Sequence, residues 1–488
     1  MNILLTTLNS KFIHTNLAIK YLSNSIRDKL NDLSDVCVEK REFTINNSQE
    51  YIYNEIIAGK YDIVCFSCYI WNIEKTLHLC RIIKKAIPNV TILLGGPEVT
   101  FDGEKILGEN PFVDIILCGE GEVVLPNILR EIYDDGCASK KIYKAMPITT
   151  NDMTFPYRDE EIEENKIIYY EASRGCPYNC SYCMSSIEKK VRGLPIERVK
   201  NELKFFLDRN VKQVKFLDRT FNWHKERSYE IFKFLIENDN GKTNFHFEIC
   251  AENMTEDTID LISKARCGLF QFEIGIQSTY DKTLKAVDRL SDVELLLSKT
   301  KKLIALRNAH IHVDLIAGLP YENYERFKKS FDDVYLLKAD ALQLGFLKLL
   351  KGTKIREEED KFNYIYDDKA PYQIIRNEFM SPYDLVSLKK IEHVLDDYYN
   401  KGGFENSLDE FVKIFGSSFE FFSEFAQFYH EAGYQHMSHK KEDNYRILNK
   451  FAEVVLDNYK IKEVIYKDLI NRMNEDAVKK FNKKGWEI

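Results

Sequence analysis

Three cysteines are the residues of this sequence whose spacing most directly indicates chemistry. Cys176, Cys180 and Cys183 lie within eight residues, directly after a predicted strand and Arg174-Gly175. Thiolates are the usual ligands of iron–sulfur clusters, and three of them on one loop can hold three irons of a four-iron cube. The fourth iron would then lack a protein ligand and could bind a small molecule. The alternative is a structural zinc site, which would need a fourth Cys or His close by, and none lies nearby in the sequence.

The composition is typical of a globular chain with two or three domains. Of 488 residues, 44% are apolar and 30% are charged, and the net charge is −8, which argues against a broad nucleic-acid surface but allows a local basic patch. No apolar run reaches the roughly 18–20 residues that span a bilayer, and the N-terminus lacks the basic region of a signal peptide. We therefore expect a cytoplasmic protein without membrane contact, in which a cysteine cluster indicates a metal or redox site rather than disulfides.

Residues 1–138 alternate short apolar strands with helical stretches, as in α/β proteins. This alternation predicts a doubly wound parallel sheet with both faces covered, whose ligands lie beyond the carboxyl ends of the strands. Helices are expected at about 16–30 and 73–86. The predicted strands are Ile3–Thr7, Val36–Arg41, Asp62–Ser67, Thr91–Leu94 and Asp114–Cys118. The polar residues 139–166, with Pro147 and Pro156, are expected to form a linker.

A second alternating region, residues 167–361, predicts an open or partial (β/α)6 barrel with its chemistry at the carboxyl ends of the strands. From residue 362 the alternation stops, and helical periodicity in Ser387–Tyr399 and Leu408–Glu431 predicts a C-terminal helical domain over residues 362–488. The six predicted barrel strands are Ile167–Ala172, Val211–Leu217, Phe245–Ala251, Leu269–Ile276, Ile311–Ala317 and Ala341–Lys348.

The cysteine motif after the first barrel strand resembles that of the radical S-adenosylmethionine superfamily, CxxxCxΦC, in which Tyr182 fills the aromatic place Φ. The resemblance covers the barrel to about residue 350. It implies a [4Fe–4S] cluster that cleaves S-adenosylmethionine, and an electron donor such as flavodoxin or ferredoxin. The segment 217–222 departs from the family's usual Gly-Gly-Glu, and each single contact residue could instead serve the barrel rim or a turn. The implied S-adenosylmethionine contacts are Tyr182, Asp218, Glu248, Gln277, Ser278, Gly318 and Pro320.

A doubly wound domain ahead of such a barrel resembles the cobalamin-binding domain of class B radical enzymes. The alternative is a flavodoxin-like domain with another ligand or none. His14 stands in the loop where many cobalamin domains have D-x-H-x-x-G, but Phe12 and Leu17 replace the Asp and the Gly. We therefore expect no protein imidazole on cobalt. Tyr69 and Trp71 could cover the lower corrin face or pack the sheet edge. The implied cobalamin contacts are His14, Ser67, Tyr69, Gly95, Gly96, Glu98, Gly119 and Gly121.

The combined resemblance implies a cobalamin-dependent radical enzyme that transfers a methyl group to an unactivated carbon. The substrate, whether a small molecule, a peptide or RNA, is not identified by the sequence. An alternative within enzymes is radical cyclisation, rearrangement or redox chemistry without methyl transfer. The alternative outside enzymes is a cobalamin and iron–sulfur sensor. Cys250, near the mouth of the third barrel strand, could donate a hydrogen atom, although a small core residue is the favoured interpretation.

Overall fold

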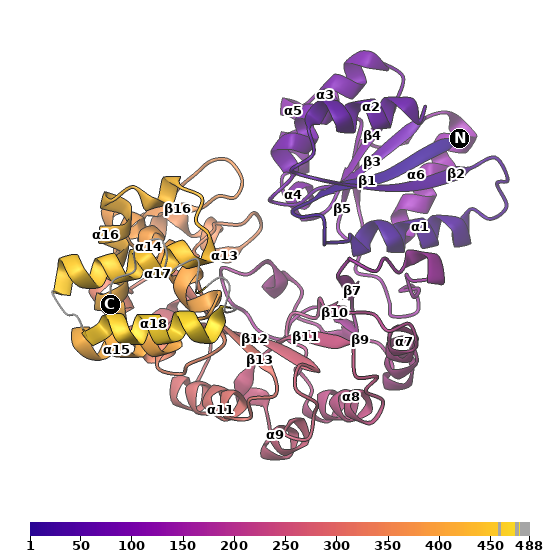
Figure 1. Ribbon diagram of the computed structural model, residues 1–488. Helices are drawn as coiled ribbons and strands as arrows, with labels where there is room; N and C mark the ends of the chain where they lie inside the picture. The colour runs from indigo at the N-terminus through magenta and orange to yellow at the C-terminus, as the bar shows by residue number, and fades with distance from the viewer. Residues whose placement is uncertain (457–459, 474–477, 479–488) are drawn as a thin grey trace.

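The protein is described from a computed structural model, which covers residues 1–456, 460–473 and 478. Figure 1 shows an N-terminal α/β domain, a barrel below it and a group of C-terminal helices beside the barrel. The expected fold class is confirmed: a doubly wound parallel sheet, a partial (β/α)6 barrel and a helical region follow one another along the chain. The final part of the expected C-terminal domain, residues 474–477 and 479–488, lies outside the described residues.

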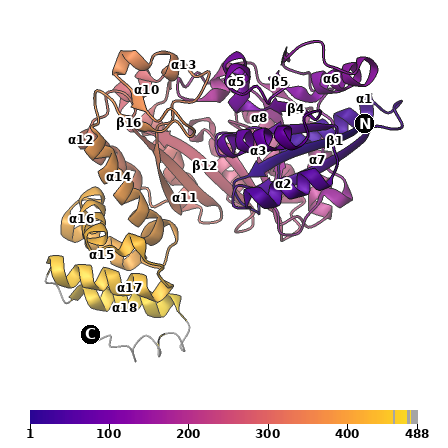
Figure 2. The ribbon, with the colours of Figure 1, turned by 90° about the horizontal axis from the view of Figure 1, so that it is seen from above.

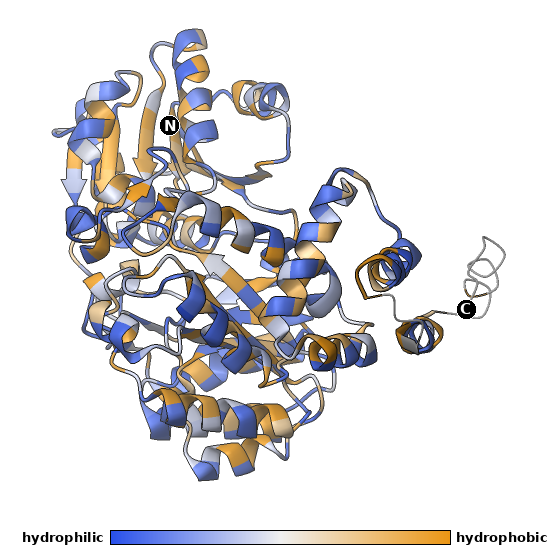
Figure 3. Cartoon of the chain, turned by 90° about the vertical axis from the view of Figure 1, so that its left-hand side faces the viewer, coloured by the Kyte–Doolittle hydropathy of each residue, from blue (hydrophilic) through white to orange (hydrophobic). Residues whose placement is uncertain are grey.

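The first sheet has six parallel strands in the order β2-β1-β3-β4-β5-β6. Successive side chains along its strands point to opposite faces of the sheet. Leu4 and Leu8 therefore belong to the apolar core on one face, whereas Ile3 and Leu5 belong to the core on the other. Figure 3 shows apolar residues concentrated on these strands. The strands are β1 (Asn2–Asn9), β2 (Cys37–Thr44), β3 (Ile63–Ser67), β4 (Thr91–Gly95), β5 (Ile115–Cys118) and β6 (Ile142–Lys144).

Helices cover both faces of this sheet. The helices α1 (Leu17–Lys29) and α6 (Gly121–Asp135) pack together over the face of Ile3 and Leu5. The opposite face is covered by α2 (Gln49–Ala58), α3 (Ile73–Ala86), α4 (Pro97–Thr100) and α5 (Gly103–Glu109). This arrangement leaves the carboxyl ends of the strands open toward the barrel, where a ligand can enter.

The segment expected to be a linker contributes the sixth strand of the first sheet. Strand β6 pairs in parallel with β5, with Ile142 opposite Ile116. A three-residue edge strand in which Tyr143 alone is buried carries too short a pattern to be recognised in the sequence. The rest of the segment packs against the barrel, where Tyr157 contacts the ring of Phe206.

The second sheet is the open barrel, with six parallel strands in the order β14-β13-β12-β11-β10-β7. Along β12 the residues alternate strictly: Phe270, Phe272 and Ile274 are buried against the surrounding helices. The strands are β7 (Ile168–Tyr170), β10 (Gln213–Phe216), β11 (Asn244–Ile249), β12 (Phe270–Gln277), β13 (His310–Ala317) and β14 (Ala341–Phe346). The helices around them are α7 (Ile196–Asp208), α8 (Lys225–Glu237), α9 (Glu256–Ile262), α10 (Asp281–Ala286), α11 (Val293–Ala305) and α12 (Tyr324–Tyr335).

The C-terminal region begins with a small hairpin, β15 (Ile365–Tyr366) and β16 (Ile374–Arg376), and not with a helix. The predicted helix over 408–431 is two helices, because Gly416 adopts φ +75° and ends the first. Figure 2 shows α17 and α18 at the far end from the first domain. The helices are α14 (Pro382–Leu395), α15 (Glu405–Phe415), α16 (Ser418–Glu431), α17 (Lys441–Phe451) and α18 (Lys460–Arg472).

In the part of the chain that the structure describes, every helix is too short or too polar to cross a lipid bilayer.

Candidate cofactor and active site

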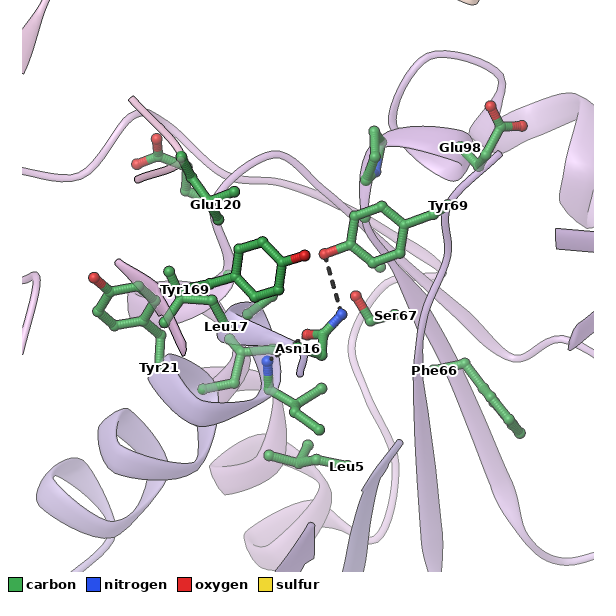
Figure 4. A pocket seen from close by; sticks show the side chains of 18 of the residues that line it. Leu5, Asn16, Leu17, Tyr21, Phe66, Ser67, Tyr69, Glu98, Glu120 and Tyr169 are labelled. Atoms are coloured by element: carbon green, nitrogen blue, oxygen red, sulfur yellow. Dashed lines mark hydrogen bonds between the residues drawn. The ribbon is translucent and has the colours of Figure 1, made fainter. Parts of the chain in front are cut away.

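A cavity of about 720 Å³ lies at the carboxyl ends of the first sheet and reaches the barrel. Its walls come from the loops after β1, β3, β4 and β5, together with Tyr169, Leu217 and Arg219 of the barrel. Figure 4 shows Tyr69 and Tyr169 facing each other across this space. The residues expected to contact cobalamin all line the cavity, although their contact with the cofactor stays a prediction: His14, Ser67, Tyr69, Gly95, Gly96, Glu98, Gly119 and Gly121.

The glycines at the rim of this cavity have different roles. Gly96 has φ +101°, and a Cβ atom there would lie 2.6 Å from the carbonyl oxygen of Cys68. Gly119 has φ +87°, and a Cβ atom there would lie 2.8 Å from the carbonyl oxygen of Ala145. These two positions therefore require glycine for the backbone itself. At Gly95 the nearest atom to a Cβ would be 3.7 Å away, so a side chain would fit and would fill the cavity. The wall is thus open for a bulky planar ligand such as a corrin ring.

Tyr69 is held rigidly at the wall of this cavity. Its ring stacks on Trp71 with centroids 4.5 Å apart and planes 4° apart, and Asn16 donates a hydrogen bond of 3.3 Å to its hydroxyl. The indole of Trp71 donates to the Leu8 carbonyl. Burial raises the pKa of Tyr69, so a neutral phenol faces the cavity. Asn16, which also caps α1, was not among the predicted contacts.

The three cysteines of the motif line a second cavity, of about 250 Å³, at the mouth of the barrel. Their loop follows β8 (Ser173–Arg174), which pairs with β9 (Arg192–Gly193). Gly175 allows the turn into the loop, because it has φ +91° and a Cβ would lie 2.5 Å from the carbonyl of Lys190. The Cys176, Cys180 and Cys183 thiols are free, so three sulfur donors from one loop face one cavity, as a cluster with an open iron requires.

Some residues expected to contact S-adenosylmethionine line the second cavity. Tyr182, Glu248 and Gln277 belong to its wall. Burial raises the pKa of Glu248 to about 7. The nearby Glu273 is partly buried, which alone would raise its pKa, but hydrogen bonding to His246 and the charge of Lys215 bring its pKa down to about 2. Of the carboxyls that line this cavity, Glu248 is therefore poised near neutrality whereas Glu273 stays ionised.

The other expected contacts lie outside the lining of this cavity. The buried carboxylate of Asp218 accepts hydrogen bonds from the Ala172 amide at 2.8 Å and the Ser173 hydroxyl at 2.6 Å. The Ser278 hydroxyl donates to the carboxylate of Glu322. The carbonyls of Gly318 and Pro320 accept hydrogen bonds from the Asn377 and Thr283 side chains, respectively. All four residues therefore hold strand ends in place, and their contact with S-adenosylmethionine stays a prediction.

Three further polar residues of the second cavity were not predicted. Arg289 donates to the Gly275 carbonyl, and its guanidinium lies 3.8 Å from the Cys180 sulfur. Asp314 also lines this cavity, and its carboxylate lies 3.4 Å from the ring of His312. Arg219 lines both cavities. Arg219 stands inside the strand-end segment 217–222 that the sequence had already singled out, whereas no local pattern marks Arg289 or Asp314.

Arg219 lies between the two cavities and belongs to the wall of both. Its side chain is exposed to them, and within the described residues it has no ion pair within 4.0 Å and no side-chain hydrogen bond. Such an unpaired guanidinium offers a fork of donors to an anionic or polar group that is held between the cavities.

Cys250 also lines the second cavity, and its sulfur lies 3.6 Å from a carboxylate oxygen of Glu252. Burial raises the pKa of this thiol, so it is neutral at pH 7. Its expected alternatives, hydrogen donor or small core residue, both remain predictions.

Family comparisons agree with this two-cavity arrangement. The B12 binding domain family matches residues 3–129 and the radical SAM superfamily matches residues 170–334. The family described as "Protein of unknown function (DUF4080)" matches residues 360–487. The chain is 26% identical over 300 residues to the cobalamin-dependent radical SAM methyltransferase TokK of Streptomyces tokunonensis. That match covers 55% of the chain and 44% of TokK, so the chain spans less than half the length of this relative.

Solved structures show the same fold. The cobalamin-dependent S-adenosylmethionine radical enzyme OxsB, with aqua-cobalamin and S-adenosylmethionine bound, superposes with a TM-score of 0.64 at 16% identity, covering 99% of this chain and 81% of OxsB. The radical S-adenosylmethionine methyltransferase TsrM from Kitasatospora setae, with cobalamin and a [4Fe–4S] cluster bound, superposes with a TM-score of 0.60 at 14% identity, covering 76% of each chain. The chain therefore belongs to the proteins that combine a B12 binding domain with a radical SAM domain, and it carries an additional C-terminal DUF4080 domain.

Proposed function

We propose that this protein is a cobalamin-dependent radical S-adenosylmethionine enzyme that transfers a methyl group to an unactivated carbon of its substrate. The observation that carries the proposal is that one side chain, Arg219, lines both cavities. A substrate held there would contact the cobalamin site on one side and the cluster site on the other. The proposal includes an external electron donor, such as flavodoxin or ferredoxin. The name of the relative TokK, a methyltransferase, supports methyl transfer over other radical reactions.

When bound, the cluster with S-adenosylmethionine would supply a hydrogen-abstracting radical, and cobalamin would supply the methyl group. The chain's own residues would bind and orient. Cys176, Cys180 and Cys183 would hold the cluster, and the glycine-edged wall of the first cavity would hold the corrin. Arg219 would orient the substrate, and the mainly apolar lining of the first cavity would limit water around the corrin.

The test uses the full chain with reconstituted cluster and cobalamin, a chemical reductant, and S-adenosylmethionine labelled in its methyl group. Small-molecule, peptide and RNA fractions are offered separately as substrate sources. We expect label in one product, with 5′-deoxyadenosine and S-adenosylhomocysteine formed in near-equal amounts. The triple cysteine-to-alanine variant is the matched control. An unlabelled product formed together with 5′-deoxyadenosine would favour rearrangement or redox chemistry, and binding of both cofactors without any S-adenosylmethionine cleavage would favour a sensor.

A further inference from the structure

The segment that connects β14 to the C-terminal helices, residues 347–376, contacts the loops of both candidate cofactor sites. Within it, the short helix α13 (Lys354–Glu357) lies beside the cysteine loop, because the Ile355 amide donates a hydrogen bond of 3.0 Å to the carbonyl of Ser181. Lys354 pairs with Asp288 at 2.7 Å. We call residues 347–376 the connecting segment. Its second part, from residue 360, belongs to the DUF4080 match.

The same segment reaches the first domain at Glu98. This glutamate is only 3% exposed, so its carboxylate depends on protein partners. The hydroxyl of Tyr372 donates a hydrogen bond of 2.7 Å to one carboxylate oxygen of Glu98. The ammonium of Lys351 lies 3.6 Å from that same oxygen and 3.4 Å from the carboxylate of Asp102. It also donates a hydrogen bond of 3.2 Å to the backbone carbonyl of Glu98. A buried carboxylate with one phenol and one ammonium as partners is a specific and directional contact.

The contact between the connecting segment and the first domain also includes close packing. Gly352 has φ +73°, and a Cβ there would lie 2.5 Å from the ring of Phe101. Ala370 packs against the apolar core on the α2–α3 face of the first domain. The guanidinium of Arg356 covers the ring of Tyr372 with 4.7 Å to the centroid. The connecting segment therefore fits closely against the first domain over residues 98–102.

Glu98 follows Gly96 and Pro97, and all three line the first cavity. Inside the first domain, the Glu98 amide reaches the Cys68 carbonyl at 3.3 Å. The carboxylate points away from Tyr69 and Ser67 in Figure 4 and is bound from outside the first domain by Tyr372 and Lys351. The wall of the cobalamin cavity is thus held partly by residues 351 and 372, which lie beyond the barrel strands.

We propose that Tyr372 and Lys351 are positioning residues that hold the loop 96–102 in its cobalamin-binding geometry, and that the contribution of Tyr372 is one role of the DUF4080 domain. The inference rests on the proposed function, because it takes cobalamin as the ligand of the first cavity. A ligand binds more weakly to a loop that spends part of its time outside the binding geometry. The apparent dissociation constant is the intrinsic constant divided by the fraction of molecules whose loop is competent to bind. Losing a hydrogen bond to a buried carboxylate weakens such a contact about tenfold or more.

The experiment measures hydroxocobalamin binding to the full chain with reconstituted cluster. For Tyr372→Phe and Lys351→Met we expect a dissociation constant about tenfold higher and faster cobalamin dissociation, while the iron content stays that of the unmodified chain. Tyr366→Phe is the matched control, because its hydroxyl donates to Glu359 at 2.6 Å in the same segment and, within the described residues, makes no hydrogen bond to the first domain. This control should bind cobalamin as the unmodified chain does.

A double-mutant cycle separates positioning from general destabilisation. With Glu98→Gln in place, Tyr372→Phe should have a much smaller further effect, because both changes act on one contact. Unchanged cobalamin affinity in both Tyr372→Phe and Lys351→Met would overturn the inference. So would a parallel loss of iron in these variants, since that result indicates general unfolding. If the unmodified chain itself fails to bind hydroxocobalamin, the proposed function fails instead.

Discussion

The hydroxyl of Tyr169 lies 2.6 Å from Nδ1 of His14, across the boundary between the barrel and the first domain. Burial raises the pKa of Tyr169 to about 12 and lowers that of His14, so both groups are neutral at pH 7. Tyr169 is therefore the hydrogen-bond partner of Nδ1 of His14. A phenol that donates to Nδ1 leaves the proton of the neutral imidazole on Nε2, which then has no lone pair for a metal.

The first prediction follows from this pair: cobalamin bound by the protein should have no protein imidazole on cobalt. The EPR spectrum of the cob(II)alamin form reports this directly, because a nitrogen ligand splits the axial lines into three. We expect no such splitting, in the unmodified chain or in His14→Ala. A three-line splitting that disappears in His14→Ala would show that His14 does ligate cobalt.

The second prediction concerns the cluster. After anaerobic reconstitution the chain should hold about four irons at the three-cysteine site. Replacing Cys176, Cys180 and Cys183 together by alanine should abolish both the cluster and 5′-deoxyadenosine formation, since these side chains are the sulfur donors of one loop. Iron analysis and chromatography of the nucleoside products measure the two effects. The exposed Cys267, changed to alanine, is the control that should retain both. Retained S-adenosylmethionine cleavage in the triple variant would refute the assignment.

The third prediction is a pH dependence of stability. Burial raises the pKa of Asp218 to about 7 from its usual 3.8. Between these values the native state keeps a proton that the unfolded state has lost, so the free energy of unfolding falls as the pH rises from about 4 to about 7. The slope from this one group is at most about 1.4 kcal/mol per pH unit. Urea unfolding across this range should show a steeper fall in the unmodified chain than in Asp218→Asn. Equal slopes would contradict the raised pKa.

The fourth prediction concerns Arg219. Arg219→Met should lower product formation by about tenfold or more, because a hydrogen bond to a charged group is worth roughly 1.5–3 kcal/mol, whereas Arg219→Lys should retain part of the activity. Cobalamin binding and iron content should stay unchanged in both variants, because Arg219 bridges the cavities and holds neither loop. Product formation at the unmodified rate in Arg219→Met would show that the substrate does not contact this guanidinium.

The fifth prediction concerns Cys250. Cys250→Ala should turn over normally and give the same product, as expected for a small buried side chain. Product analysis after complete turnover, with 5′-deoxyadenosine as the internal measure of radical formation, tests this. If 5′-deoxyadenosine forms while the product is lost or altered, Cys250 is a hydrogen donor.

The sequence predicts the features of this protein that are local in the chain. Both parallel sheets are foreseen because short apolar strands alternate with helical stretches along the chain, and the three cysteines because they occupy one loop. Strand β6 and the hairpin β15–β16 are missed because two or three residues carry no periodicity. The Tyr372–Glu98 hydrogen bond joins residues 274 positions apart, and nothing in either neighbourhood indicates its partner. Asp218 is placed at the correct strand end, but its burial against Ala172 depends on the packing of the whole barrel.

The barrel and the C-terminal helices share one continuous apolar core. Phe331 and Tyr335 of α12 pack edge-on against Phe419 and Phe422 of α16, with centroids 5.5 and 5.8 Å apart. Asp332 between them accepts hydrogen bonds from the start of α16. The C-terminal helices are therefore not a detachable module: a chain cut after residue 361 would expose these rings to water and aggregate. In a barrel of this kind without such helices, the same face of α12 would meet water, and we expect polar residues in place of Phe331 and Tyr335.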